Sequence, residues 1–339
     1  MNINRRKFIT TLGLATVSTQ IPSFAVRATT SPNNIIKPPR LKVGDTVGLI
    51  SPAGIIDSED VQEAREIFTS LGLKVKPGRH ILDRYGYLAG IDRNRAGDVN
   101  AMFADKSVKA IIAMRGGWGG NRILPLLNYN SIRANPKIIM GYSDITSLLL
   151  AIIARSGLVT FHGPVATSTW NDFTWKYVKS ILFDAQVVAM NNTLVTKLSR
   201  KIITPGKAKG KFIGGNLSVI NSMLGSSYLP TWKDSILFIE DIGEDIYRVD
   251  RMLVQLKNAG ILTQISGFVF GQCTRCSTGD EPSLTLMQVL QEHIAPLNIP
   301  AWYGSMIGHI RDKFTLPIGI NVEINASTGI IKMLEAAVR

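Results

Sequence analysis

Residues 136–146 read PKIIMGYSDIT, a short apolar run that stops at a glycine and passes directly into a helical pattern. The run predicts a buried strand, and the apolar stretch 145–154 predicts the helix that follows. A tight strand-to-helix turn lifts a side chain above the sheet, and the helix N-terminus offers backbone N–H groups to an oxyanion. The turn therefore makes Ser143 a candidate nucleophile. Because the last glycine of Gly-x-Ser-x-Gly is absent, Ser143 or Asp144 as a simple helix N-cap is the alternative.

Strand and helix patterns alternate before this turn. Apolar, β-rich runs at 46–50 and 109–114 predict two further strands, and a helical pattern between them starts near Ser58 and ends at Gly72. Alternation of this kind is typical of a parallel sheet covered by helices, an α/β fold. Such sheets bind ligands at the carboxyl ends of their strands, where Ser143 would stand.

The periodicity weakens between 167 and 205, where polar stretches rich in Asn, Thr and Lys predict an inter-domain linker. We therefore expect an N-terminal domain over 41–166 and a C-terminal domain over 206–339. The C-terminal domain also has an α/β pattern. Its predicted strands, helices and tail of short strands are 235–240 and 267–272, 247–257 and 284–294, and 314–333.

The first 28 residues have the pattern of a targeting segment. Arg5 and Arg6 directly precede the apolar run 8–17, as in a twin-arginine export signal. We exclude 1–28 from the fold, treat 29–40 as a leader, and expect a periplasmic or otherwise extracytoplasmic protein without a membrane span in its mature part. A short basic helix or an uncleaved anchor is the alternative.

The chain is basic, with 38 Lys and Arg against 25 Asp and Glu and a formal net charge of +13. These cations are scattered, and the sequence has no basic stripe with interleaved aromatic residues, so no nucleic-acid partner is expected. For an exported protein, an anionic envelope polymer or peptide is the more natural partner, attracted by long-range electrostatic steering.

A serine nucleophile needs a base, and the chain has only four histidines. His80 lies in a predicted polar loop and His293 on an amphipathic helix, where neither is expected to act in catalysis. His162 and His309 both stand beside glycine at the end of an apolar run, as residues presented into a cleft would. Sequence spacing alone leaves these two nearly even.

A catalytic histidine also needs a carboxylate that orients it. Glu240 closes the apolar run 236–239, where a carboxylate is costly to bury without a partner. Asp241 and Glu244 are its rivals, expected to be solvated or to cap the helix that begins near Tyr247.

The glycine-rich segment 115–120 follows a predicted strand and has two interpretations. A phosphate-binding loop is the weaker one, because the spacing is neither Gly-x-Gly-x-x-Gly nor that of a P-loop. We expect instead a backbone that approaches a bound peptide closely and donates a second oxyanion N–H group.

The chain has two cysteines, Cys273 and Cys276. Two thiols are too few for a zinc site, and the loop that follows them does not open a helix as a redox motif would. We expect a structural pair or a local disulfide, with redox chemistry a distant second.

Taken together, the motifs resemble those of the LD-carboxypeptidase family, which also contains the microcin C immunity peptidases. The resemblance runs in order over nearly the whole mature chain. Its segments are 50–52, 87–90 with Arg93 and Arg95, 115–119, 136–146, 162–164, 214–217, 240–241 with 250–253, and 308–309.

The resemblance implies a Rossmann-like N-terminal domain with a parallel sheet, joined to a swivelling-type, β-rich C-terminal domain. It also implies a catalytic triad built across both, with Ser143 as nucleophile, His309 as base and Glu240 as the orienting acid. No metal or organic cofactor is implied, and the family suggests a homodimer.

By the same resemblance, the oxyanion hole falls on the N–H of Asp144 and on one from the glycine loop, assigned to Gly117. His162 then becomes structural or adjacent to the substrate. Trp118 stands where tyrosine is common in the family, which places the subsite preference in doubt rather than the catalysis.

The expected function is hydrolysis of the L,D-amide bond that releases the terminal D-alanine from a murein tetrapeptide. Cleavage of a different amide, such as a peptide antibiotic conjugate, is the alternative among hydrolases. A periplasmic two-lobed binding protein without turnover is the alternative from another class.

Overall fold

A computed structural model describes residues 34–192, 200–279 and 282–339. The predicted signal segment 1–28 and the leader up to residue 33 lie outside these residues. In the described part of the chain, no helix combines the length and apolar character needed to cross a bilayer.

The first sheet holds the predicted strand-to-helix turn. Its six strands within the described residues run in the order β12-β5-β4-β3-β1-β2, and all neighbours pair in parallel except β12 with β5. The strands are β1 (Thr46–Ile50), β2 (Lys74–Pro77), β3 (Val108–Ala113), β4 (Ile138–Gly141), β5 (Thr160–His162) and β12 (Leu316–Ile318).

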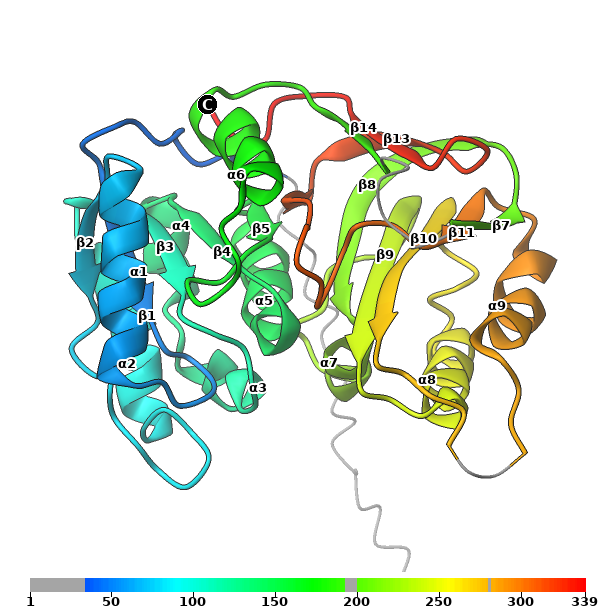
Figure 1. Ribbon diagram of the computed structural model, residues 1–339, viewed down its shortest axis with the longest axis horizontal. Coiled ribbons are helices and arrows are strands. Elements are labelled where there is room, and N and C mark those ends of the chain that lie inside the picture. The colour runs from blue at the N-terminus through cyan, green and yellow to red at the C-terminus, as the bar shows by residue number, and fades with distance from the viewer. Residues whose placement is uncertain (1–33, 193–199, 280–281) are drawn as a thin grey trace, which may run out of the picture. The chain divides into compact units, whose positions relative to one another are not determined.

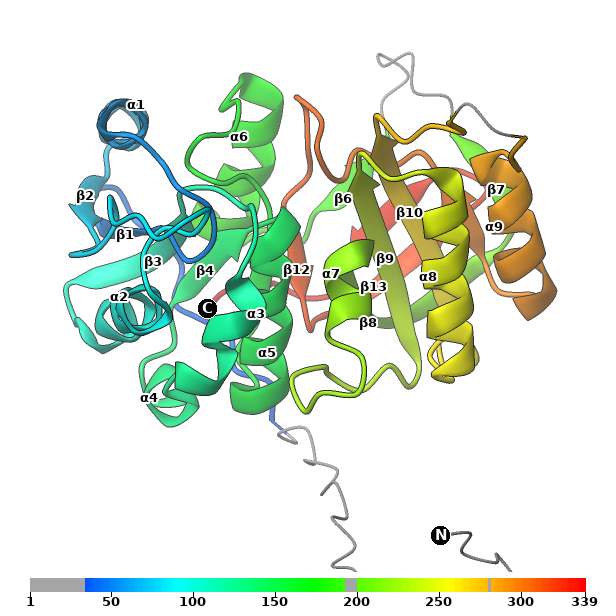
Figure 2. The same cartoon turned by 90° about the horizontal axis from the view of Figure 1, so that it is seen from below.

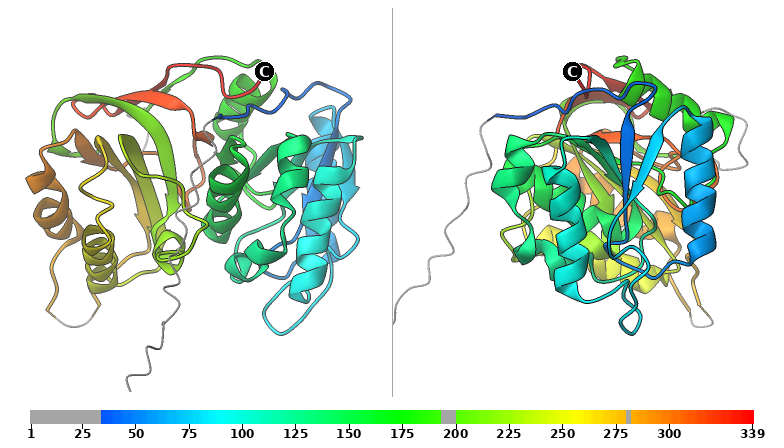
Figure 3. Two further views of the ribbon diagram at one scale, coloured as in Figure 1. Left: turned by 180° about the vertical axis from the view of Figure 1, so that it is seen from behind. Right: turned by 90° about the vertical axis from the view of Figure 1, so that its left-hand side faces the viewer.

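Helices cover both faces of this sheet. Helix α1 lies on one face, whereas α2 and α4 lie on the other, as Figure 2 and the right-hand view of Figure 3 show. Asp57 and Asp60 form a capping box that starts α1. The helices of this half are α1 (Ser58–Ser70), α2 (Asp92–Ala104), α3 (Gly120–Ile123), α4 (Tyr129–Ala134) and α5 (Thr146–Ser156).

The second sheet is mixed. Its eight strands within the described residues run in the order β6-β14-β13-β8-β9-β10-β11-β7, and β8 to β11 form a parallel centre flanked by antiparallel pairs. These strands are β6 (Ala189–Asn191), β7 (Lys201–Thr204), β8 (Lys207–Asn216), β9 (Ser235–Ile242), β10 (Gly267–Thr274), β11 (Ala301–Tyr303), β13 (Asn321–Asn325) and β14 (Ile330–Met333).

The remaining helices belong to this second half or to the connection before it. In Figure 1, α7 and α8 lie beside the strands β8 to β10, and α9 lies next to α8 towards β7. The helices are α6 (Asp172–Val178), α7 (Leu217–Ser222), α8 (Ile246–Asn258) and α9 (Leu286–Ile294).

Helix α5 joins the two halves. Nearly all of its residues are buried, because it packs against β4 and β5 on one side and against β8 and α7 on the other. A helix that is apolar all round is stable only when it is enclosed in this way. The hydrophobic core therefore continues from one sheet to the other as one cluster.

The α/β fold class expected from the sequence is confirmed. For two segments the sequence predicted the place in the fold only in part. The segment 167–205 contains α6 and the edge strands β6 and β7, so it contributes to the second sheet as well as connecting the halves. Strand β12 was expected within the C-terminal domain, but it pairs with β5 at the edge of the first sheet, where Pro317 is tolerated.

Candidate active site

Ser143 stands at the carboxyl end of β4, on the turn that leads into α5. Its backbone has a φ of 63°, in the left-handed region that residues with a side chain rarely adopt. The 3₁₀ turn Ser143–Ile145 continues directly into α5. Strain of this kind at a strand-to-helix turn is the geometry of a nucleophile elbow.

The glycine loop 115–120 lies against this turn. A methyl group added at Gly116 would lie 2.9 Å from Ser143 Oγ, so only glycine lets the loop backbone pass this close to the hydroxyl. Gly117 has a φ of +128° and packs in the same way against Gly54. The loop backbone therefore lies beside the Ser143 hydroxyl, and its approach to a bound peptide stays a prediction.

Asp144 connects the turn and the loop. Its carboxylate accepts the Gly120 N–H at 2.7 Å, and burial raises the pKa of Asp144 to about 6. The Asp144 N–H lies at the start of the 3₁₀ turn, where backbone N–H groups lack acceptors within the helix. Asp144 and Gly117 both line the cleft that contains Ser143, and their assignment to an oxyanion hole stays a prediction.

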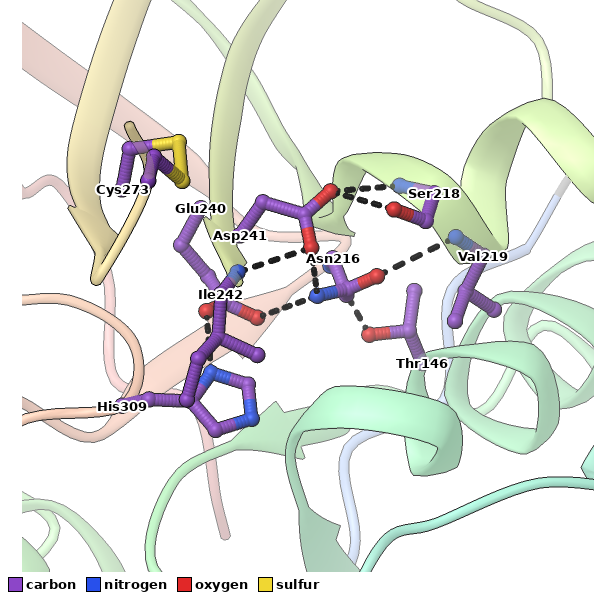
Figure 4. A network of polar contacts seen from close by, with 10 residues as sticks. Thr146, Asn216, Ser218, Val219, Glu240, Asp241, Ile242, Cys273 and His309 are labelled. Atoms are coloured by element: carbon purple, nitrogen blue, oxygen red, sulfur yellow. Dashed lines mark hydrogen bonds and ion pairs between the residues drawn. A yellow bond between two sulfur atoms is a disulfide. The ribbon is translucent and has the colours of Figure 1, made fainter. Parts of the chain in front are cut away.

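Glu240 and His309 form a hydrogen-bonded pair. Glu240 lies near the end of β9, is fully buried, and accepts from His309 Nδ1 at 2.8 Å and from Asn216 Nδ2 at 3.2 Å (Figure 4). Burial alone would raise the pKa of Glu240, but the hydrogen bond and charge of His309 outweigh it and lower that pKa. A carboxylate held in this state fixes the orientation of the imidazole and stabilises its protonated form.

Gly308 makes this pair possible. Its φ is +112°, and a methyl group there would lie 2.7 Å from Glu240 Oε2, the oxygen that binds His309. Glycine is thus required both by the backbone conformation and by the space that the carboxylate occupies.

Asp241 differs from the sequence expectation, because it is buried rather than solvated. Its carboxylate accepts from Ser218 N at 2.9 Å and from Asn216 Nδ2 at 3.0 Å (Figure 4). Burial, followed by the nearby charge of Glu240, raises the pKa of Asp241 to about 6. The Asn216 N–H in turn donates to Thr146 Oγ1 at 3.0 Å, which ties the second sheet to α5 beside Ser143.

The other three histidines differ from His309 in position. His162 is buried, with 2% exposure, and burial lowers its pKa to about 4. His80 bonds to Asp83 in a loop, and His293 bonds to Asp250 between α9 and α8. Among the four histidines of the chain, His309 is the one that lines the cleft with Ser143.

Two side chains behind the pair were not singled out from the sequence. The Tyr142 ring meets the His309 ring edge-on, with centroids 4.9 Å apart. Lys313 Nζ lies 4.3 Å from the centroid of the same Tyr142 ring, and burial lowers the pKa of Lys313 to about 8. Tyr142 adjoins the predicted nucleophile in sequence, but no local pattern marks Lys313, whose position beside Tyr142 depends on the tertiary fold.

The candidate site is a cleft of about 640 Å³. Ser143 and His309 both line it, although in the described part of the chain no hydrogen bond joins their side chains. Catalytic hydrogen bonds are often long before substrate binds. The other lining residues are Arg115, Gly117, Trp118, Asp144, Asn216, Ser218, Val219, Ser222, Asp241, Ile242, Glu244 and Arg275.

The cleft offers hydroxyl, imidazole, carboxylate and backbone N–H groups. Within residues 34–192, 200–279 and 282–339, no three His, Cys, Asp or Glu side chains converge as metal ligands would. Exposed Trp118 lines the cleft, with its ring centroid 6.5 Å from that of Tyr87, and its contact with a substrate stays a prediction.

The chain belongs to the LD-carboxypeptidase family. A family model described as the LD-carboxypeptidase N-terminal domain matches residues 47–163, and one described as its C-terminal domain matches residues 209–324. The predicted family resemblance is thereby confirmed.

Individual relatives bear names that agree with this family. A protein of Bacillus subtilis named "Probable murein peptide carboxypeptidase" is 39% identical over 298 residues, 86% of this chain and 92% of the relative. The murein tetrapeptide carboxypeptidase of Pseudomonas aeruginosa is 30% identical over 285 residues, 80% of this chain and 91% of the relative. The solved structure of the microcin C7 self-immunity protein MccF in its apo state has a TM-score of 0.83 at 28% identity, covering 90% of this chain and 100% of that chain.

Proposed function

We propose that this protein is a serine carboxypeptidase that releases the terminal D-alanine from murein tetrapeptides, with Ser143, Glu240 and His309 as its catalytic triad. The observation that supports this most is the buried Glu240–His309 pair, whose imidazole faces the same cleft as the strained Ser143. The names of the two murein peptidase relatives support the substrate.

In the proposed mechanism, His309 takes the proton from Ser143 Oγ as that oxygen attacks the carbonyl carbon before D-alanine. Glu240 keeps the imidazole oriented and stabilises its positive charge. The N–H groups of Asp144 and Gly117 bind the oxyanion of the tetrahedral intermediate. His309 then protonates the amine of the departing D-alanine, which leaves an ester on Ser143.

Water completes the cycle. His309 removes a proton from a water molecule that attacks the ester, and the collapse of the second tetrahedral intermediate returns the proton to Ser143 Oγ. The products are the tripeptide and free D-alanine, and these steps require no redox partner.

The test is to incubate the purified protein with disaccharide-tetrapeptide and to determine the mass of the product. Loss of one alanine is expected. An intact peptide that stays bound to the protein would instead support a binding protein without turnover, and an unbound, intact peptide would refute the proposed substrate.

A second candidate function is hydrolysis of a peptide antibiotic conjugate, supported by the similarity to the microcin C7 self-immunity protein. The same assay with an aminoacyl sulfamoyl adenosine separates the two. Cleavage of this compound in preference to the tetrapeptide would favour the immunity function.

We also propose that the protein is exported to the periplasm by the twin-arginine pathway and acts there as a homodimer. Arg5 and Arg6 before the apolar run support the export route. The Cys273–Cys276 disulfide supports an oxidising compartment. Analytical ultracentrifugation of the mature protein tests the dimer. A measured mass of 37.1 kDa or less, which corresponds to a single chain, would refute it.

A further inference from the structure

A disulfide closes a tight turn at the edge of the candidate site. Cys273, near the end of β10, is bonded to Cys276, three positions further along the chain, with the two Cα atoms 5.4 Å apart. The Cys276 N–H donates to the Cys273 carbonyl at 3.3 Å, so the disulfide and the hydrogen bond close the same turn. This pair is the local disulfide expected from the sequence.

Arg275 is held inside that turn in an unusual conformation. Its φ is 56°, in the left-handed region where glycine is the ordinary choice. A positive φ at the third residue belongs to several types of four-residue turn, so the closed turn accounts for this conformation. The side chain of Arg275 is exposed, and the closed turn fixes the backbone from which it projects at the cleft.

Backbone contacts fix the turn beside the catalytic strand β9. The Gly243 N–H donates to the Thr274 carbonyl at 2.9 Å, and the Ser277 N–H donates to the Glu244 carbonyl at 3.2 Å. These two hydrogen bonds lie on either side of residue 275 and attach its turn to residues 243–244, which follow Glu240. As a result, Arg275 lines the same cleft as Ser143 and His309.

We propose that Arg275 is a specificity residue that binds a carboxylate of the peptide substrate, and that the Cys273–Cys276 disulfide holds it in position. Guanidinium groups recognise carboxylates through paired, charge-assisted hydrogen bonds. The assignment rests on the proposed function and deepens it, since it names the group that recognises the acid.

The other cation in the cleft is Arg115, which is the natural rival. It donates to the Ile55 carbonyl at 3.3 Å and approaches Gly54, so its guanidinium already has a partner on the side of the first sheet. Arg275 lines the cleft from the turn that directly follows β10 of the second sheet.

Two carboxylates of a murein tetrapeptide have the required chemistry. One is the free carboxylate of the terminal D-alanine. The other ends the side chain of the third residue when that residue is a diamino diacid such as diaminopimelate, and is missing when it is lysine. Four substrates separate these sources: the acid and the C-terminal amide, each with diaminopimelate or lysine as third residue.

The experiment measures dissociation constants by calorimetry in the full-length mature Ser143→Ala protein, so that binding is read without turnover. Arg275→Gly is the informative second change, because glycine keeps the turn and its φ while removing the guanidinium. Arg115→Gln tests the rival, and Arg65→Gln on the exposed surface of α1 is the matched control.

We expect Arg275→Gly to weaken binding of the carboxylate-bearing substrate about 10- to 100-fold and to abolish the preference over the substrate that lacks this carboxylate. If the variant no longer prefers the acid over the amide, Arg275 binds the terminal carboxylate. If it no longer prefers diaminopimelate over lysine, Arg275 binds the carboxylate on the side chain of the third residue. The control should bind all four substrates as the parent does.

The disulfide is tested in the same assay with the double variant Cys273→Ser/Cys276→Ser. It should lose part of the same preference, and in an otherwise native chain it should raise KM for the acid with kcat unchanged. A purely structural disulfide would lower thermal stability without affecting the preference.

The proposal is overturned if Arg275→Gly retains both preferences, or if Arg115→Gln is the variant that loses them. Failure of the proposed function gives a different result, because chains with Ser143 intact would then release no D-alanine whatever residue occupies position 275.

Discussion

Replacing Gly308 with alanine should disable catalysis while leaving the protein folded. Gly308 directly precedes His309, and the added methyl group would lie 2.7 Å from Glu240 Oε2 and 2.9 Å from Glu240 Cβ. Carbon atoms do not approach this closely, so one of the two residues must move. Glu240 has 0% exposure and cannot swing into solvent.

The magnitude follows from the short contacts. The His309 Nδ1–Glu240 Oε2 distance is 2.8 Å, so a displacement of about half an ångström takes it beyond the range of a good hydrogen bond. Misplacing a catalytic group by about 1 Å costs roughly 100-fold in rate, and complete loss of the orienting carboxylate costs about 10⁴-fold. We therefore expect kcat to fall between about 10²- and 10⁴-fold. An alanine in the left-handed region also costs about 1–2 kcal/mol of stability.

Gly225→Ala is the matched control. Gly225 has a φ of +80°, and no heavy atom lies within 4 Å of the position its methyl group would take. It should lose a similar amount of stability and keep its kcat. The assay is steady-state release of D-alanine together with urea unfolding of each variant. A folded Gly308→Ala enzyme with the kcat of Gly225→Ala would refute the reasoning.

Three further predictions concern charge, pH and export. Glu240→Gln should lower kcat for D-alanine release by less than loss of Ser143 or His309, since the amide preserves part of the orientation; an effect equal to theirs would contradict this. The pKa of His162 is about 4 when folded and about 6.5 when unfolded, so its contribution to stability is complete above pH 6.5 and falls toward pH 4, by roughly 3 kcal/mol in total. Urea unfolding over this range should therefore show that His162→Gln loses less unfolding free energy on acidification than the parent does. Equal losses in both proteins would disprove the lowered pKa of His162. Replacing Arg5 and Arg6 by lysine should leave the precursor in the cytoplasm, because lysine does not reproduce guanidinium geometry; undiminished periplasmic protein in a fractionation blot would end the export proposal.

The strand-and-helix framework was largely predictable. The runs 46–50, 235–240 and 267–272 are continuous and apolar because parallel strands are buried on both faces, and they correspond to β1, β9 and β10. Strand β8 was missed, since its first half alternates lysine with small residues and its second half is rich in glycine. The pairing of β12 with β5 joins residues about 150 positions apart, which no local pattern encodes.

The candidate site was predictable only in part. The glycine loop 115–120 and the glycine before His309 are visible in the sequence, and the structure gives a physical reason for them in the contacts of Gly116 and Gly308. The choice of His309 over His162 needed the family resemblance, because both have the same local pattern. Burial of Asp241 depends on contacts with α7 and β8, so it could not be foreseen.

The triad itself is tested most directly by kcat for D-alanine release in Ser143→Ala, His309→Ala and the double variant, with His162→Ala for comparison. Because the three groups act as one unit, each single change should cost several orders of magnitude, and the double variant should be scarcely slower than either. Binding of the tetrapeptide should persist in all of them. If His162→Ala abolishes turnover in a folded protein while His309→Ala remains active, the catalytic histidine has been wrongly assigned.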